Sequence, residues 1–354
     1  MKRITFLSFV ISLFCTSILA EAPAGYYTNA KGKSKEALKT ALNSIISSNY
    51  KQWSYDKLYT IYAESDVTDE GKVWDMYSTC TWTPGQKKCG SYKNVCDCYN
   101  REHSIPQSWF DEKSPMKSDA FHVYPTDGKV NGQRSNYPFG ECSGGTSLGG
   151  KALGRLGTST FSGYSGKVFE PDDQYKGDFA RTYFYFVTRY QNQMSSMSGD
   201  SFAKNTYPSL SKWSIDLFLK WHRQDPVSQK EIDRNDAVYS FQQNRNPFID
   251  HPELAEYIWG NKIGQVWNGG TALNDQLLLQ EVVINSTTQK GMLHLHTEET
   301  ANITYTIYSM TGVVMQHGQI EGSDNYIPAS FPQGIYIIQL QAGGQTKALK
   351  FAVQ

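Results

Sequence analysis

A change of residue pattern near Asn268-Gly269-Gly270 divides this 354-residue chain into two parts. Before it, apolar residues recur at intervals of three and four, the pattern of amphipathic helices. After it, short segments rich in β-branched and aromatic residues alternate with turn residues, the pattern of a small β-sandwich. We therefore expect an α+β chain, mostly helical over residues 21–273 and all-β over residues 274–354.

Residues that commonly cap the start of a helix locate some helices of the first part. Ser34 and Ser54 precede apolar residues at helical spacing over residues 38–46 and 55–62. In the same way, Ser228 followed by Glu231 has the pattern of a capping box.

Two other segments predict strands. Residues 73–82 are expected to form one, and alternation over residues 120–124 predicts another that ends at Pro125. Thr126 or Asp127 then offers a cap for a following helix.

The first 20 residues have the pattern of a secretory signal peptide, with cleavage expected after Ala20. Lys2 and Arg3 precede an apolar run over residues 6–14, which is too short to span a bilayer comfortably. We expect the mature protein to be exported, to have no transmembrane segment and to be a monomer.

Five cysteines follow the leader, and we interpret them as a disulfide framework. They lack paired C-x-x-C spacing, which argues against a zinc site, and an exported chain meets an oxidising compartment. The odd number leaves one thiol free, and the pairing cannot be read from the sequence. The five are Cys80, Cys89, Cys96, Cys98 and Cys142.

The formal net charge is zero and the sequence pI is about 7.0, so no overall basic field indicates a nucleic-acid partner. Any phosphate-binding surface must therefore be a local patch. Residues 145–151 match the opening of a nucleotide-binding P-loop, but Ala152 replaces the required hydroxyl residue. We interpret this stretch as a loop.

Two short blocks carry the residue types of a metal-assisted hydrolase. Residues 100–106 (NREHSIP) contain Glu102 and His103, and residues 130–136 (VNGQRSN) contain Asn131. Carboxylate and amide oxygens suit a hard divalent cation, and an imidazole has a pKa suited to a general base. Together they favour a site that holds one cation and activates a water molecule.

The adjacent positions of Glu102 and His103 pose a geometric difficulty. Neighbouring residues of a regular strand point to opposite faces, so both reach one site only if the strand ends or twists there. Pro106, just downstream, is consistent with such an end.

Taken together, the two blocks resemble the bacterial endonuclease I family, secreted or periplasmic nucleases with a ββα-metal core. The likeness extends from about Tyr50 to Asn268. It implies that Glu102 and Asn131 bind one Mg²⁺ ion, or another divalent cation such as Mn²⁺ or Ca²⁺. It also implies that His103 is the general base, and that DNA, and often RNA, is cut to 5′-phosphate ends.

Some members of that family carry a longer insertion whose arginine holds the scissile phosphate, and this chain lacks it. Arg134 is our candidate for that catalytic role, with Lys113, Lys117, His122 and Asn136 as candidate substrate-binding residues. A solvated surface position is an equally good interpretation of Arg134 and the two lysines. His122 has the alternative of a purely local hydrogen bond.

The end of the chain resembles a type IX secretion C-terminal sorting domain. The resemblance is carried by residues 307–312 (IYSMTG), 331–336 (FPQGIY) and 350–353 (KFAV). It implies the type IX secretion machinery as a partner, and a protein that is released or attached to the cell surface.

Two other functions stay open from the sequence. One is a surface protein that binds nucleic acid or acts as an adhesin without turnover, although the intact Glu102, His103 and Asn131 argue against it. The other is a metal phosphoesterase for small substrates, which the near-neutral charge permits.

Overall fold

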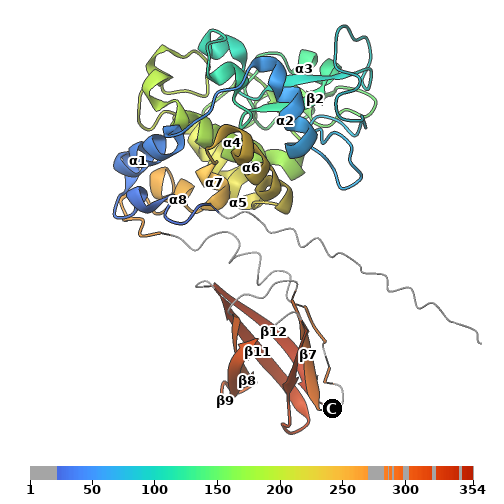
Figure 1. Ribbon diagram of the computed structural model, residues 1–354, viewed down its shortest axis with the longest axis vertical. Helices are drawn as coiled ribbons and strands as arrows, with labels where there is room; N and C mark the ends of the chain where they lie inside the picture. Colours follow the sequence, from blue (N-terminus) through green and yellow to red (C-terminus); the bar gives the residue numbers. More distant parts are fainter. Residues whose placement is uncertain are drawn as a thin grey trace, which may run out of the picture.

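The computed structural model describes residues 22–269 and, beyond them, residues 283–285, 287–288, 291–297, 303–320, 324–342 and 345–353. Helices dominate the first range and strands make up the others, which confirms the expected α+β class (Figure 1). The predicted signal peptide lies outside the described residues, as does the predicted domain boundary after residue 273. Both stay predictions.

In the first range, the α-helices are α1 (Lys35–Ser47), α2 (Leu58–Ser65), α3 (Gly128–Arg134), α4 (Lys176–Arg189), α5 (Lys212–Gln224), α6 (Gln229–Gln242), α7 (Pro247–Asp250) and α8 (Leu254–Ile258). Short 3-10 helices are η1 (Thr28–Ala30), η2 (Tyr55–Lys57), η3 (Gln107–Phe110), η4 (Met116–Ser118), η5 (Asp173–Tyr175) and η6 (Gln191–Ser196). The strands are β1 (Tyr99–His103), β2 (Val123–Asp127), β3 (Thr146–Ser147), β4 (Arg155–Thr158) and β5 (Lys167–Glu170).

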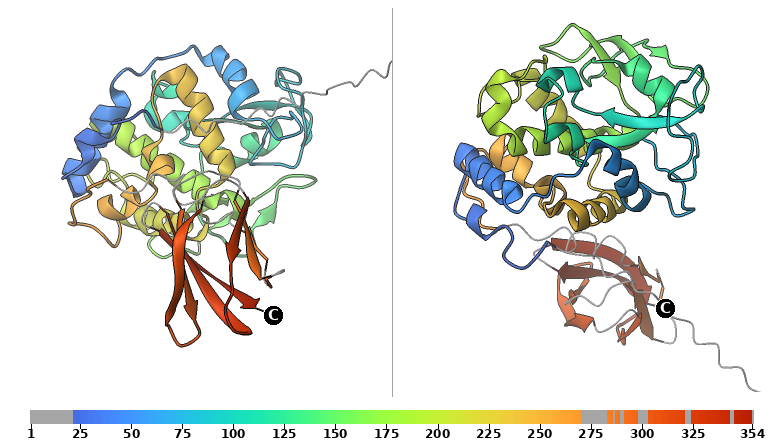
Figure 2. Two further views of the ribbon diagram at one scale, coloured as in Figure 1. Left: turned by 60° about the horizontal axis from the view of Figure 1, so that its bottom comes forward. Right: turned by 45° about the horizontal axis from the view of Figure 1, so that its top comes forward.

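Helix α4 forms the centre of this part of the molecule. Apart from Arg189, all of its residues are buried, including the aromatic run from Tyr183 to Phe186. A helix that is buried on every side needs neighbours all round it. It packs against α1, α5 and α7, and Figures 1 and 2 show it enclosed by other helices.

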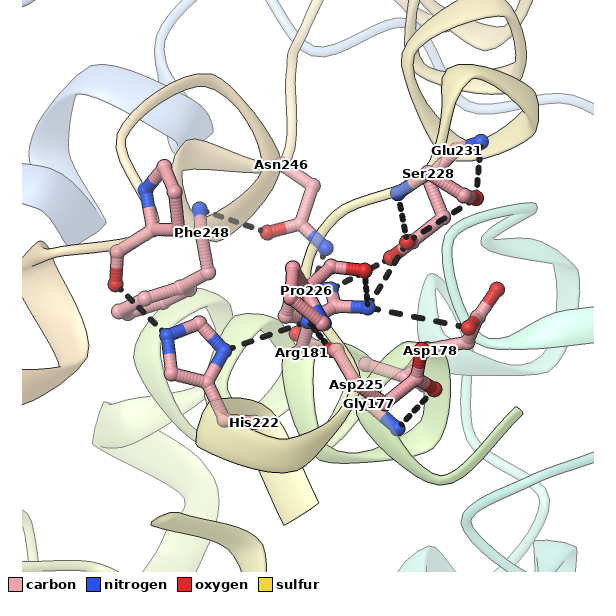
Figure 3. A network of polar contacts seen from close by, with 12 residues as sticks. Gly177, Asp178, Arg181, His222, Asp225, Pro226, Ser228, Glu231, Asn246 and Phe248 are labelled. Carbon is pink, nitrogen blue, oxygen red and sulfur yellow. Dashed lines mark hydrogen bonds and ion pairs between the residues drawn. The ribbon is translucent and has the colours of Figure 1, made fainter. Parts of the chain in front are cut away.

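A buried ionic network ties α4 to α6 and to the turn that precedes α6 (Figure 3). Arg181 of α4 donates from Nη2 to the Glu231 carboxylate at 2.8 Å and from Nη1 to the Asp225 carbonyl at 2.8 Å. Glu231 also closes the predicted capping box with Ser228, which confirms that prediction. A buried guanidinium is tolerated because its charge and its donors are matched in this way.

The expected helix over residues 38–46 is confirmed as α1, and the one over residues 55–62 begins as η2 and continues as α2. The strand expected over residues 73–82 was wrong, because only isolated bridges occur there, at Val73 and Ser78. The buried Asp75 carboxylate accepts hydrogen bonds from the backbone N–H of Tyr77 and from the hydroxyl of Ser78. Such local bonds compete with a strand ladder.

Two disulfides join the cysteines that follow this segment, Cys80 to Cys96 and Cys89 to Cys98, and Cys142 is a buried free thiol. The prediction of two bridges and one free cysteine is therefore confirmed, and the structure supplies the pairing.

Strands β1 and β2 pair antiparallel, and α3 follows β2 directly, so the three form a ββα unit. Glu102 lies opposite Tyr124, and His103 opposite Val123. The expectation that Pro125 ends its strand was wrong, because Pro125 lies within β2. A two-stranded sheet has only edge strands, which tolerate a missing N–H.

The later ranges form two antiparallel sheets, ordered β10-β7-β6 and β12-β11-β8-β9. Their strands are β6 (Val283–Ile284), β7 (Met292–His296), β8 (Ile303–Ser309), β9 (Val314–Ile320), β10 (Asp324–Pro328), β11 (Gly334–Ala342) and β12 (Gln345–Val353). Alternate residues from both sheets share one core, among them Leu293, Ile307 and Leu340. The expected sandwich is present, although β9 and β10 were not predicted.

Among the helices of the described residues, none has the length and apolar character that a membrane crossing needs.

Candidate active site on strand β1

Strand β1 presents alternate side chains to two different environments, as its pleat requires. Asn100 and Glu102 face α3, where the Asn131 amide nitrogen donates to Asn100 Oδ1 at 2.7 Å and Arg134 Nη1 donates to Glu102 Oε1 at 2.9 Å. His103 points to the other side. The structure therefore brings Glu102, Asn131 and Arg134 to one face and places the imidazole on the opposite one.

Glu102 is a buried acid, 2% exposed, with hydrogen bonds that hold its carboxylate in place. Oε1 accepts from Tyr77 Oη at 2.8 Å as well as from Arg134. Burial nevertheless raises the pKa of Glu102 to about 7, against the lowering effect of the Arg134 charge. The Arg134 charge therefore does not fully offset the cost of burying the ionised carboxylate, and a bound cation would stabilise that ionised form further.

Asn131 is half-buried in α3, and its amide is oriented by the bond to Asn100. Because the amide nitrogen is used there, the carbonyl oxygen is the atom left to bind a ligand. The helix itself is fixed at its start by Asp127, which accepts from Val130 N at 2.9 Å and from Cys96 N at 2.6 Å. An amide oxygen and a buried carboxylate on one face fit a hard divalent cation.

Arg134 is 1% exposed, and both of its terminal nitrogens donate hydrogen bonds inside the protein. Besides Glu102, its guanidinium donates to the carbonyls of His103 at 2.9 Å and Ser104 at 2.7 Å. These bonds hold the end of β1 against α3. A side chain so enclosed does not fit the role of phosphate clamp that the sequence suggested, and we assign it a positioning role instead.

His103 is 4% exposed and lies among aromatic rings, with centroids 5.7 Å from Tyr55, 6.0 Å from Phe110 and 5.7 Å from His122. Its Nε2 is 3.0 Å from the carbonyl oxygen of Lys117. A carbonyl can only accept, so Nε2 carries the proton and Nδ1 keeps the lone pair. Burial, and next the neighbouring His122, lower the pKa of His103 to about 3, which keeps the ring neutral.

His122, expected to bind substrate, is 0% exposed, and its Nε2 bonds to the Met116 carbonyl at 2.6 Å. The alternative of a local hydrogen bond therefore describes it better than substrate binding. Asn136, two residues after the end of α3, is exposed.

The two candidate lysines are paired with exposed carboxylates. Lys113 lies 3.0 Å from Asp111, and Lys117 lies 2.7 Å from Glu112. Lys113 is exposed, as a solvated surface residue would be. Lys117 belongs to the site more closely, because its backbone carbonyl binds His103 and its ammonium lies 5.6 Å from the centre of the Tyr55 ring.

Three residues next to the site were missed from the sequence. Arg101 shares a strand face with His103, two positions along β1, and its guanidinium lies 3.6 Å from the centre of the Tyr55 ring. The strand period was the signal that pointed to Arg101. Tyr55 precedes Glu102 by 47 positions and Tyr77 by 25, so only the folded chain brings them close.

The sequence matches known proteins over much of its length. A family model described as Endonuclease I matches residues 34–253. An extracellular ribonuclease of Bacillus amyloliquefaciens is 36% identical over 246 residues, covering 66% of this chain and 78% of that protein. An extracellular deoxyribonuclease of Aeromonas hydrophila is 24% identical over 251 residues, covering 67% of this chain and 95% of that protein.

Among solved structures, PorZ, a surface component of the type IX secretion system of Porphyromonas gingivalis, matches with a TM-score of 0.21 and 15% identity. The match covers 25% of this chain and 13% of that chain, and a likeness this slight carries no argument.

Proposed function

Because this chain belongs to the endonuclease I family, it is a phosphodiester hydrolase, and we propose that it is a secreted, divalent-metal-dependent endonuclease acting on RNA and DNA. The two relatives named above are extracellular nucleases, one for each nucleic acid, which supports both substrates and export. The observation that carries the proposal is the end of strand β1, where a buried carboxylate and a neutral, carbonyl-bonded imidazole occupy the last two positions, so the strand ends where both groups are needed.

Glu102 and Asn131 are the residues that would hold the metal ion. Their oxygens lie on the α3 face of β1, and the raised pKa of Glu102 supports a cation there, because a positive charge would stabilise its ionised form. When bound, such an ion supplies positive charge that lowers the cost of attack on the anionic phosphate and of departure of the leaving oxygen. Arg134 and Tyr77 keep the carboxylate in position.

His103 is the proposed general base. Its Nδ1 takes a proton from a water molecule as the water oxygen bonds to phosphorus and the bond between phosphorus and O3′ breaks. The electron pair of that bond leaves with O3′, which takes a proton from solvent, and the phosphate stays on the 5′ oxygen. The Lys117 carbonyl, which accepts from Nε2, stabilises the positive charge that the ring gains.

Export is proposed to use both ends of the chain. Residues 1–20 would direct passage across the inner membrane, and residues 274–354 would engage the type IX machinery as a sorting domain. The support is the sequence resemblance of the C-terminal segments and a β-sandwich with a core of its own. Deleting residues 274–354 is expected to leave active nuclease inside the cells, and continued secretion of the deleted form would contradict this proposal.

The function is tested by incubating plasmid DNA and a single-stranded RNA with the purified protein in Mg²⁺, and again after adding a chelator. We expect cleavage only with the metal, and products whose 5′ ends are accepted by a ligase without prior phosphorylation. Cleavage that continues in chelator would contradict the metal requirement. Ends that need phosphorylation before ligation would contradict the proposed position of bond cleavage.

A further inference from the structure

We propose that the His103 side of β1 continues into a binding track for single-stranded nucleic acid, an inference that rests on the proposed nuclease function. The track alternates aromatic rings with cationic side chains. We call it the stacking strip, and it consists of Trp53, Tyr55 and Tyr59 with Lys51, Lys57 and Arg101.

In the stacking strip, each ring has at least one cation over its face. The ammonium groups of Lys51 and Lys57 lie 4.4 Å and 5.3 Å from the centre of the Trp53 ring. The Arg101 guanidinium lies 3.6 Å from the centre of the Tyr55 ring and 4.7 Å from that of Tyr59. Arg101 thus links two rings, and the strip is continuous from Tyr55 to Tyr59.

The rings are held in place yet are not fully buried. Trp53, Tyr55 and Tyr59 are half-buried. The Trp53 indole nitrogen donates to the Phe241 carbonyl at 2.8 Å, and Arg101 donates to the Tyr55 carbonyl at 3.0 Å. Rings fixed in this way can stack a base with little further ordering, which is how proteins hold unpaired strands.

The strip leads directly to the proposed base. The Tyr55 ring that carries Arg101 on its face lies 5.7 Å from the His103 ring, centre to centre. A strand whose bases stack along the strip would therefore bring its backbone toward His103. The lysines of the strip, which lie over the ring faces, would turn outward to meet the phosphates as bases take their places. The planar guanidinium of Arg101 can itself stack on a base.

The chemistry of the strip favours an unpaired strand over a duplex. In a duplex the base faces are already stacked on one another, so aromatic side chains gain access only to bases that have come out of the stack. Duplex binding instead relies on phosphate contacts and on groove edges.

A second cation–aromatic pair provides a matched control. Lys262, in the turn after α8, lies 5.0 Å from the centre of the ring of Tyr257 on α8, which is also half-buried. Helix α8 lies at the other end of this part of the molecule from α3 in Figure 1. This pair stands apart from His103 and is not expected to bind substrate.

The first test measures binding of a fluorescent single-stranded oligonucleotide in chelator, by anisotropy. Trp53→Leu is expected to weaken binding about 10-fold, within the range for loss of one base–aromatic stack. Trp53→Phe keeps a ring and should restore most of the affinity, whereas Tyr257→Leu should leave it unchanged. Equal affinities of Trp53→Leu and Tyr257→Leu for the oligonucleotide would contradict the proposed role of the stacking strip.

A second test looks for a gain in affinity. Arg101 is paired with Asp56 at 2.8 Å, and the Asp56 side chain is 93% exposed. An exposed pair of this kind is weak, so a phosphate can take the place of the carboxylate. Asp56→Asn is expected to tighten binding about two- to fivefold, the range that loss of such a pair allows.

Asp216→Asn is the control for this gain, because it removes the same charge from another exposed pair, with Lys212 on α5 at 2.6 Å. Binding by Asp56→Asn no tighter than that of Asp216→Asn would contradict the role given to Arg101.

The outcomes also separate this inference from the proposed function. If His103→Ala lacks turnover while Trp53→Leu binds like the wild type, the strip is wrong and the nuclease mechanism stands. If His103→Ala keeps its turnover, the mechanism is wrong whatever the strip variants do. If Trp53→Leu weakens binding of a duplex as much as that of a single strand, the preference for single strands is overturned.

Discussion

The two faces of strand β1 are built differently. On the face toward α3, Glu102 and Arg134 are buried and joined by an ion pair at 2.9 Å, with side chains 3% and 1% exposed. On the other face, His103 lies under Tyr55, whose ring carries the partly exposed guanidinium of Arg101. One face is closed and ionic, and the other is aromatic, cationic and partly open to solvent.

The difference between the two faces shows how burial acts on an acid and on a base that are neighbours in one strand. Burial favours the neutral form of both reactive groups, so it raises the pKa of Glu102 to about 7 and lowers that of His103 to about 3. The neutral imidazole keeps a lone pair that can accept a proton, and its lowered pKa makes it a weaker base than an ordinary histidine. The buried Glu102 carboxylate, by contrast, would be stabilised in its ionised form by the cation that we propose it binds. Burial thus has opposite effects on the pKa values of the two groups, and under the proposed function only the Glu102 face calls for a metal ion.

The largest expected effect on stability comes from breaking the closed face. Arg134→Ala would leave the Glu102 charge buried without its partner, which typically costs about 3–5 kcal/mol in the free energy of unfolding. All eight tryptophans precede residue 268, so fluorescence in a urea titration reports on this part of the chain.

Arg155→Ala is the control for that titration. Arg155 also pairs with a glutamate, Glu170, but its side chain is 48% exposed and Lys176 remains as a partner of that carboxylate. We expect a loss of at most about 1 kcal/mol for this exposed pair. Equal losses for the two variants would contradict the closed, ionic description of the α3 face.

A smaller effect is expected on metal affinity when the orientation of Asn131 is released. Asn100→Ala removes the partner of the Asn131 amide, and loss of such a supporting residue typically weakens metal binding about 10- to 100-fold. The metal concentration for half-maximal cleavage should rise accordingly, and activity should recover at high metal.

Asn205→Ala serves as its control, because it removes a side-chain bond to the Ser209 backbone between η6 and α5. An Asn100→Ala variant with the metal dependence of this control would remove Asn131 from the proposed metal site.

The smallest effect is a pH dependence that distinguishes the faces. Without metal, the folded-state pKa of Glu102 lies above its ordinary 4.5, at about 7, so its contribution to stability is full below pH 4.5 and is lost as the pH rises through 7. Because the metal needs the ionised carboxylate, stabilisation by Mg²⁺ should grow between pH 5 and pH 8.

Asp75 also has a pKa raised to about 7 by burial, so it can contribute to the same pH dependence. The informative quantity is therefore the difference in stabilisation by Mg²⁺ between the wild type and Glu102→Gln. Thermal unfolding with and without Mg²⁺ measures it. A metal response that grows with pH equally in both proteins would show that Glu102 is not the group involved.

Local pattern was enough to predict part of this molecule. The helix spacing after Ser34, the capping box at Ser228 and the formation of two bridges with one thiol left free depend on nearby residues or on composition. The strand period also indicates that Glu102 and His103 point to opposite faces, whereas their convergence on one site was expected from the family resemblance and stays a prediction.

Other features depend on contacts that no local pattern encodes. An arginine is usually a surface residue, but the partners of Arg134 at the end of β1 and just beyond it are 30 to 32 positions away in the sequence. Only those contacts make its burial tolerable. The net charge of zero was misleading in a similar way. An average over the chain does not reveal that Lys51, Lys57 and Arg101 gather beside aromatic rings.

The division of tasks between the two faces is tested most directly by comparing His103→Ala with Glu102→Gln in one experiment. For each, the Mg²⁺-induced shift in melting temperature and the rate of cleavage of a single-stranded RNA are measured. We expect His103→Ala to keep the wild-type shift while its turnover falls about 10²- to 10⁴-fold, and Glu102→Gln to lose the shift. A His103→Ala variant with normal turnover, or a Glu102→Gln variant with a normal shift, would contradict the account.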